Sequence, residues 1–157
     1  MESIVRAYIE LLEAINFNNP IIYSGIREGL NKFLSNAFLD QPGHKYQNGH
    51  FYSQMAFEKV NKKDYTGLIF EHMIPKHKYI QKPCMEMAMK NNLDQNKVRE
   101  LINKYWKIAI ITKEENSRLR GRTMPKDWDG EDIFRRYNDA GIELIAKEDY
   151  HWISELD

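Results

Sequence analysis

The chain has 157 residues, of which 42% are hydrophobic and 29% charged, a size and composition that fit one globular domain with a real core. Its 23 basic side chains balance 23 acidic ones, which argues against a protein that coats nucleic acid by charge alone. The single cysteine excludes an internal disulfide, and no apolar run approaches the roughly 20 residues of a membrane span, so we expect a soluble, cytoplasmic protein with no membrane partner.

The N-terminal part of the chain is predicted to be a helical hairpin over about residues 1–39. Apolar residues recur at helical spacing from Ile4 to Ile15, and a second helix should begin near Pro20. A loop with several turn signals follows, and His44 and His50 flank its glycines. The next stretch, 51–60, fits either a helix or a strand. It begins the part that we expect to be catalytic, about 50–157.

The apolar run after Tyr65 predicts a strand that ends in an acid and an imidazole, Glu71-His72, before the chain turns at Pro75. The loop after a strand end is exposed on a firm scaffold, where function tends to lie. Glutamate and histidine together can bind a metal ion or pass a proton. Successive strand residues face opposite sides, so the two side chains share one site only if the strand ends or twists there. The alternative is a solvent-facing glutamate beside a hydrogen-bonded histidine.

The pattern then turns helical over 78–91 and 94–105, and residues 107–111 predict a buried strand. Thr112 and Glu115 fit a capping box. In this motif the threonine side chain accepts from the backbone N–H of the glutamate three residues later, and the glutamate side chain accepts from the backbone N–H of the threonine. A helix should therefore begin there.

The C-terminal part is predicted to be irregular over 121–130, and Asp129 could cap a last helix over 131–140. Gly141 would end that helix, and a third strand could follow over 142–145. We therefore expect an α+β fold: one helix-rich domain over 1–157 with a small sheet of two to three short strands.

Two segments, Glu71-His-Met-Ile-Pro75 and Lys113-Glu-Glu-Asn-Ser-Arg-Leu119, together resemble the motifs of the HNH (His-Me finger) nucleases. That family is built on two strands and a helix around one metal ion. The resemblance implies that His72 activates the attacking water and that Glu71 is a metal ligand. It implies that Asn116 orients His72 or helps to bind the metal. The chain between the two motifs is longer than is usual in the family.

Further metal ligands could come from the loop histidines. His44 and His50 each follow a glycine, so both could move to meet an ion that Glu71 and His72 also bind. Such a set suits a divalent ion, Mg²⁺, Mn²⁺ or Zn²⁺. The alternative is two exposed loop histidines with no ligand.

Basic residues cluster after each motif in spite of the neutral total. The residues expected to contact nucleic acid are Lys76, Lys78, Arg118, Arg120 and Arg122. Basic side chains around an acid-imidazole centre suit a phosphodiester substrate. Aromatic side chains nearby could stack on unpaired bases: Tyr79, Trp106, Trp128 and Tyr137. The alternative is a solvated charge pattern with these aromatic rings in the core.

The sequence therefore favours a metal-dependent endonuclease that acts on nucleic acid, with His72 as general base. Two alternatives stay open: a non-enzymatic protein-binding module, such as an inhibitor, an adaptor or a homodimer, and a metal-independent RNase. A compact nuclease of this kind would suit a phage, a mobile element or a defence system. DNA and RNA are equally open as substrates.

Overall fold

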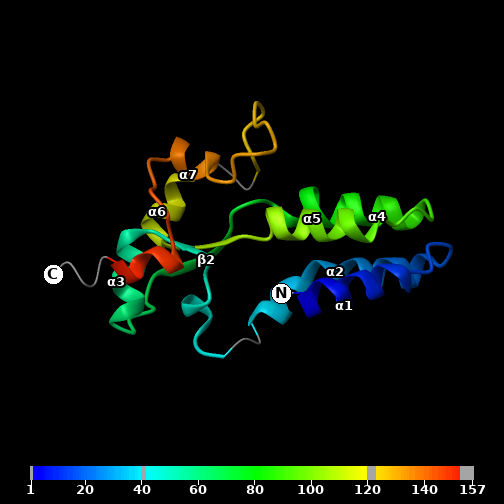
Figure 1. Cartoon of the computed structure of the whole chain (residues 1–157), viewed down its shortest axis with the longest axis horizontal. Helices are drawn as coiled ribbons and strands as arrows, with labels where there is room; N and C mark the ends of the chain where they lie inside the picture. The colour runs from blue at the N-terminus through cyan, green and yellow to red at the C-terminus, as the bar shows by residue number, and fades with distance from the viewer. Residues whose placement is uncertain (1, 40–41, 120–122, 153–157) are drawn as a thin grey trace. The chain divides into compact units, whose positions relative to one another are not determined.

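The chain divides into two compact units, each made of two stretches of sequence (Figure 1). The computed structural model describes residues 2–39, 42–119 and 123–152. The helical unit comprises Met1–Pro42 and Lys76–Trp106, and the sheet unit comprises Gly43–Pro75 and Lys107–Asp157. The prediction that 1–157 form one domain is not tested by this division and stays a prediction.

The helical unit contains the helices predicted over 1–39, 78–91 and 94–105. They are α1 (Glu2–Glu13), α2 (Pro20–Leu39), α4 (Lys82–Met89), which a π-helical turn (His77–Gln81) precedes, and α5 (Gln95–Tyr105). Helix α1 packs against α2, α4 and α5. It does so with the apolar positions that recur at helical spacing, Val5, Tyr8, Ile9 and Leu12.

Polar side chains define where two of these helices begin. The Asn19 side-chain oxygen accepts hydrogen bonds from Ile21 N at 3.1 Å and Ile22 N at 3.3 Å, at the start of α2. Asp94 accepts from the backbone N–H groups of Asn96 and Lys97 and so caps α5. Both helix starts agree with those predicted from the sequence.

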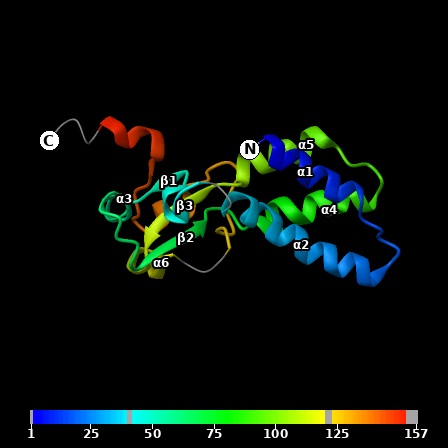
Figure 2. The ribbon, with the colours of Figure 1, turned by 90° about the horizontal axis from the view of Figure 1, so that it is seen from below.

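The sheet unit is built around four strands, which confirms the predicted α+β class with a slightly larger sheet than the two to three strands expected. They are β1 (Phe51–Tyr52), β2 (Leu68–His72), β3 (Ile108–Thr112) and β4 (Ile145–Ala146). The order across the sheet is β2-β3-β1-β4, and Figure 2 shows β3 between β1 and β2. Strand β3 pairs antiparallel with β2 and parallel with β1, and β4 pairs antiparallel with β1.

The central strand β3 forms the core of the sheet unit. Every one of its five residues is buried, as predicted for this β-rich run. A strand buried on both faces consists mostly of apolar, branched residues, and Ile108-Ala-Ile-Ile111 has that character. The strands on either side of it are therefore held against a rigid centre.

The ambiguous stretch 51–60 forms both kinds of structure, since β1 is followed at once by α3 (Gln54–Asn61). Ser53 causes the switch, because its hydroxyl accepts a hydrogen bond from Ala56 N at 3.3 Å and caps the helix. The capping box at Thr112 is also present, and α6 (Lys113–Arg118) begins there as predicted.

The C-terminal predictions are only partly correct. Asp129 accepts from Glu131 N at 2.8 Å and Asp132 N at 3.2 Å, but these bonds close a turn, and α7 (Arg135–Asp139) begins later than predicted. Gly141 does end it, at a φ of 63° that favours glycine. The last strand is β4, and Ile142, expected within it, is instead buried in the turn after α7.

None of the helices in the described ranges combines the length and apolar character that crossing a membrane requires.

Candidate functional site

Glu71 and His72 are the last two residues of β2. Glu71 lies opposite Ala109 and His72 opposite Ile108, and Met73 N donates to Lys107 O at 3.0 Å beyond them. The His72 ring meets the ring of Phe70 edge-on, with centroids 6.0 Å apart, so these two share one face of the strand. Glu71 therefore points to the other face, as the alternation of a strand requires.

An arginine from α7 meets Glu71. Both terminal nitrogens of Arg136 lie 3.3 Å from Glu71 Oε1, and Nη1 lies 3.5 Å from Met73 O. The Arg136 side chain is 4% exposed and that of Glu71 is 24% exposed. A nearly buried cation thus fixes the position of the carboxylate at the strand end.

The residue after this arginine, Tyr137, is fully buried. Burial raises the pKa of its hydroxyl well above the ordinary value, and the negative charge of Glu71 raises it further. From the sequence, Arg135 and Arg136 are expected only among the basic residues near the cleft. The pairing of Arg136 with Glu71 was not predicted, because the two segments are distant in the chain and basic residues are common between them.

Asn116 lies on α6, in the same unit. Lys113 N at the start of that helix donates to Gly67 O at 2.8 Å, and Thr112 pairs with Leu68 at the beginning of β2. Leu68 is four residues from His72 along β2, which corresponds to about 13 Å. Helix α6 packs against both β2 and β3, and Asn116 is half-buried on it. That Asn116 and His72 act on one ion stays a prediction.

His44 lies at the opposite end of β2 from Glu71. Its ring stacks on Tyr65, with centroids 3.7 Å apart, and Nδ1 accepts from Tyr46 N at 3.4 Å. The Tyr46 hydroxyl in turn donates to Leu68 O at 2.7 Å, which attaches this loop to the first residue of the strand.

His50 lies on the far side of β3 from His72, because both histidines flank Ile108. Its Nδ1 accepts from Ile108 N at 3.1 Å. Burial lowers the pKa of His50 to about 4, and the charges of Lys107 and Lys147 lower it further. The described residues contain no group of three or more His, Cys, Asp or Glu side chains suited to an ion, so the expected set of Glu71, His72, His44 and His50 is not assembled here.

Lys76 and Lys78 belong to the helical unit. The Lys76 ammonium donates to Asn31 O and, at 2.6 Å, to Ser35 Oγ, and burial lowers its pKa. This lysine therefore links its segment to α2. Lys78 is exposed and lies over the Tyr79 ring.

Arg118 is exposed at the end of α6 in the sheet unit. Arg120 and Arg122 lie outside the described residues.

Two of the aromatic residues expected to stack on bases are in the core instead. Trp106 is 2% exposed and Tyr137 is 0% exposed, so neither presents a ring face to a ligand. Trp128 is half-buried, and its indole nitrogen donates to Asp132 O at 2.7 Å. Tyr79 packs on Tyr105 in the helical unit. These rings stabilise the units, which is the more common role of such residues.

A hollow of about 580 Å³ lies beside Arg136. Its lining is rich in charge, with Lys126 and Arg135 on the basic side. Arg135 pairs with Asp127 at 2.9 Å and with Asp139 at 3.0 Å. The cation that fixes Glu71 thus also borders a polar hollow large enough for a phosphate group.

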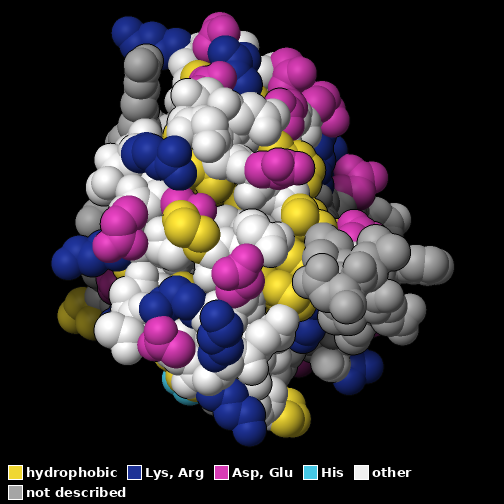
Figure 3. All heavy atoms as spheres, turned by 90° about the vertical axis from the view of Figure 1, so that its left-hand side faces the viewer, with side chains coloured by type: hydrophobic (Ala, Val, Ile, Leu, Met, Phe, Trp, Pro, Cys, Tyr) yellow, Lys and Arg dark blue, Asp and Glu magenta, His cyan; other side chains and the backbone are white. Residues whose placement is uncertain are grey.

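Charge on the face shown in Figure 3 is mixed rather than segregated. Lysine and arginine side chains alternate there with aspartate and glutamate. The described residues of this face form no broad basic surface for a duplex, so recognition of an anion by them would depend on particular pockets.

Comparisons of the chain with family models, with curated proteins and with solved structures gave no match.

Proposed function

We propose that this chain is a metal-dependent phosphodiesterase that cleaves nucleic acid at the Glu71-His72 end of β2. One observation carries the proposal: β2 and β3 form an antiparallel pair, and α6 follows β3 directly and packs on both strands. Two strands and a helix are the frame of the HNH nucleases that the sequence resembles. The three residues of the resemblance, Glu71, His72 and Asn116, lie on this frame.

The donor set fits a hard divalent ion better than zinc. Mg²⁺ is commonly bound by one or two carboxylates, with waters and substrate phosphates as its other ligands. Glu71 would supply the carboxylate, and Asn116, on the helix that begins at the other end of β2, is the second ligand that the resemblance implies. Structural zinc sites use four His or Cys ligands, and the described residues gather no such group. We therefore favour Mg²⁺ or Mn²⁺, which would supply positive charge where charge develops on the phosphate.

In this proposal His72 takes the proton of the attacking water. Its side chain and that of Glu71 extend from opposite faces of β2, so the two meet one substrate around the end of the strand, which is His72 itself. An imidazole is suited to the task because its ordinary pKa lies near neutral pH. The contact with the Phe70 ring restricts the orientation of the imidazole. Arg136 holds the Glu71 carboxylate in place, and Lys126 of the adjoining hollow would contact a phosphate of the bound strand.

The test is cleavage of single- and double-stranded DNA and RNA in Mg²⁺, Mn²⁺ or EDTA. We expect metal-dependent cutting that His72→Ala lowers by about 10²- to 10⁴-fold, the usual contribution of a general base. His77→Ala is the matched control, because His77 is an exposed histidine shortly after the strand. Metal-dependent cutting that survives His72→Ala, in a protein of unchanged melting temperature, would refute the assignment of the base. Cutting that persists in EDTA would favour the metal-independent RNase.

One observation favours the protein-binding alternative. Ile21 is 84% exposed and Ile22 is 41% exposed at the start of α2, and Met89 at the end of α4 is 51% exposed. Large apolar side chains on a surface can mark contact with a partner. Absence of cutting on every substrate would make this alternative the leading one.

A further inference from the structure

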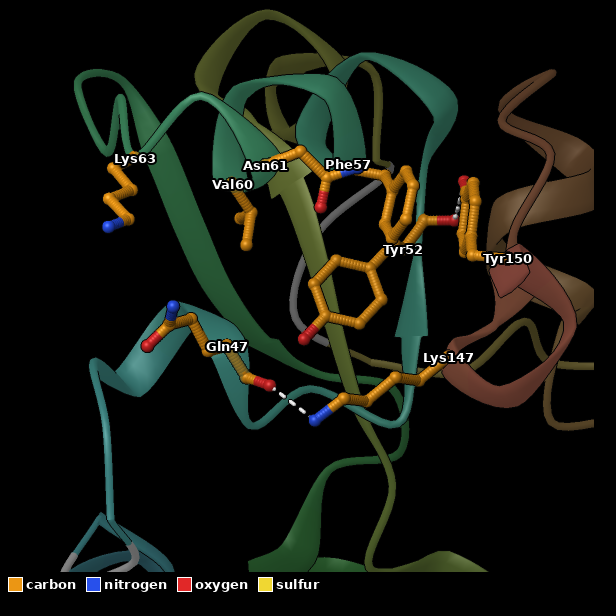
Figure 4. A pocket seen from close by; sticks show the side chains of 8 residues that line it. All are labelled: Gln47, Tyr52, Phe57, Val60, Asn61, Lys63, Lys147 and Tyr150. Carbon is orange, nitrogen blue, oxygen red and sulfur yellow. Dashed lines mark hydrogen bonds between the residues drawn. The ribbon is translucent and has the colours of Figure 1, made fainter. Parts of the chain in front are cut away.

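A second hollow of the sheet unit, of about 430 Å³, lies over β1 and α3. Eight residues line it: Gln47, Tyr52, Phe57, Val60, Asn61, Lys63, Lys147 and Tyr150 (Figure 4). Its size falls within the range of small-ligand pockets. None of these residues belongs to the proposed catalytic set, so the hollow is a separate feature of the same unit.

The apolar side of this hollow is a fixed group of aromatic rings. Phe57 and Tyr150 stack with centroids 3.5 Å apart, and the Tyr52 ring meets both at steep angles. Tyr52 is held at its hydroxyl by Gly49 N, and its carbonyl accepts from the Tyr150 hydroxyl. The rings therefore form a rigid apolar floor, of which half-buried Phe57 is the most accessible ring.

The rim of the hollow is polar and cationic. Lys63, Lys147 and the Asn61 amide line it, and Gln47 contributes its backbone carbonyl, since its side-chain oxygen accepts from His44 N at 2.8 Å. Among the described residues, the lining includes no acidic side chain. Figure 4 shows the two lysines on different sides of the Tyr52 ring. The Lys147 ammonium donates to Gln47 O at 2.7 Å, which uses one of its three N–H donors.

We infer that this hollow binds one unpaired nucleotide of a single-stranded nucleic acid. The base would contact Phe57 and Val60, and the Asn61 amide would bond to its edge. A nucleotide within a strand has a phosphate on each side, and the two lysines provide a cation for each. Aromatic rings beside cations are the usual means of binding single strands. This inference rests on the proposed function, since it names the form of nucleic acid that the enzyme would hold.

Single-stranded binding can be measured apart from cleavage. Fluorescence anisotropy in EDTA would follow the binding of a labelled single-stranded 12-mer and of the matching duplex to the full chain. The variants are Lys63→Asn, Lys147→Gln and the double variant. Lys63 has a φ of 56°, which asparagine tolerates well, so the first variant removes charge without backbone strain. Lys62→Asn is the control, because Lys62 is exposed and does not line the hollow.

We expect each single variant to raise the Kd for the single strand roughly 3- to 10-fold. In the double variant, the slope of log Kd against log salt concentration should decrease by the amount that about two phosphate contacts contribute. The Kd for the duplex should stay the same in these variants, and Lys62→Asn should bind the single strand with the wild-type Kd. Unchanged single-strand affinity in the double variant would overturn the inference, and so would an equal loss for single strand and duplex. If the lysine effects appear but no metal cuts any substrate, the binding site stands and the proposed nuclease function fails.

Discussion

The two units bury their polar side chains in different ways. In the helical unit, Lys76 and Gln81 reach groups of α2 that do not titrate: the backbone carbonyls of Asn31 and Arg27 and the Ser35 hydroxyl. In the sheet unit, two buried side chains meet carboxylates. These pairs are Arg136–Glu71 and Ser53–Glu115, and the second has an O–O distance of 2.6 Å.

This difference assigns structural and chemical roles to different parts of the chain. A backbone carbonyl does not titrate, so a bond to it holds two helices together over a wide pH range. A pair that contains a carboxylate responds to pH, to bound ions and to loss of either partner. The sheet unit should therefore be the part whose stability depends on charge, and the following three experiments test that contrast.

The largest effect is expected from Arg136→Leu. Removal of a nearly buried cation leaves the Glu71 carboxylate without its ion pair, which we expect to lower the free energy of unfolding by about 3 kcal/mol. Urea unfolding followed by circular dichroism would measure the change. Arg135→Leu is the matched control, since that side chain is 34% exposed and its pairs should contribute less than about 1 kcal/mol.

A double-mutant cycle separates the ion pair from mere packing. If Glu71→Leu together with Arg136→Leu recovers part of the stability lost in Arg136→Leu, the loss came from the unpaired carboxylate. Equal losses in Arg135→Leu and Arg136→Leu would remove the contrast between surface and buried pairs.

The next effect is a pH dependence that arises at His50. Its pKa is lowered to about 4 in the folded protein, from an ordinary value near 6.5. Between these values the unfolded chain binds more protons, so stability should fall as the pH decreases from about 6.5 to 4, and then change no further from this group. We expect a loss on the order of 2 kcal/mol, reduced from the full shift because the ring is only partly buried.

His50→Asn tests this assignment without loss of the strand contact. The asparagine side-chain oxygen can accept the bond from Ile108 N that Nδ1 accepts now, but it does not titrate. The slope of stability between pH 4 and 6.5 should therefore become shallower in the variant. A slope identical to that of the wild type would show that other groups cause the acid sensitivity.

Much of the fold could be predicted because local chemistry determines it. The Thr112–Glu115 box and the Asp94 cap each begin a helix with side chains close in sequence, and both are present. The predicted start of the last helix was wrong, because Asp129 makes the same bonds in a turn as it would at a helix N-terminus. Local pattern could not distinguish these two uses of one aspartate.

The candidate site was only partly predictable because its contacts are distant in sequence. The acid and imidazole at the end of β2 followed from a strand pattern and a proline. The pairing of Glu71 with Arg136, and the contact of Phe57 with Tyr150, depend on how the chain folds back. For the same reason His44 was grouped with the metal site, although Tyr65 holds its ring at the other end of β2.

The smallest effect is expected from Lys76→Met, which tests whether this lysine serves stability or substrate binding. Methionine retains the apolar stem beside Trp106 but leaves Asn31 O and Ser35 Oγ without the ammonium. The lost bonds are partly offset because a buried charge no longer has to be desolvated, so we expect a loss of about 1 kcal/mol in urea unfolding. Lys78→Met is the control for an exposed lysine of the same unit.

If Lys76 instead contacts phosphate, as its position after Glu71-His72 first indicated, the variant would lose affinity for nucleic acid and keep its stability. The wild-type affinity together with lower stability would place Lys76 among the groups that hold α2.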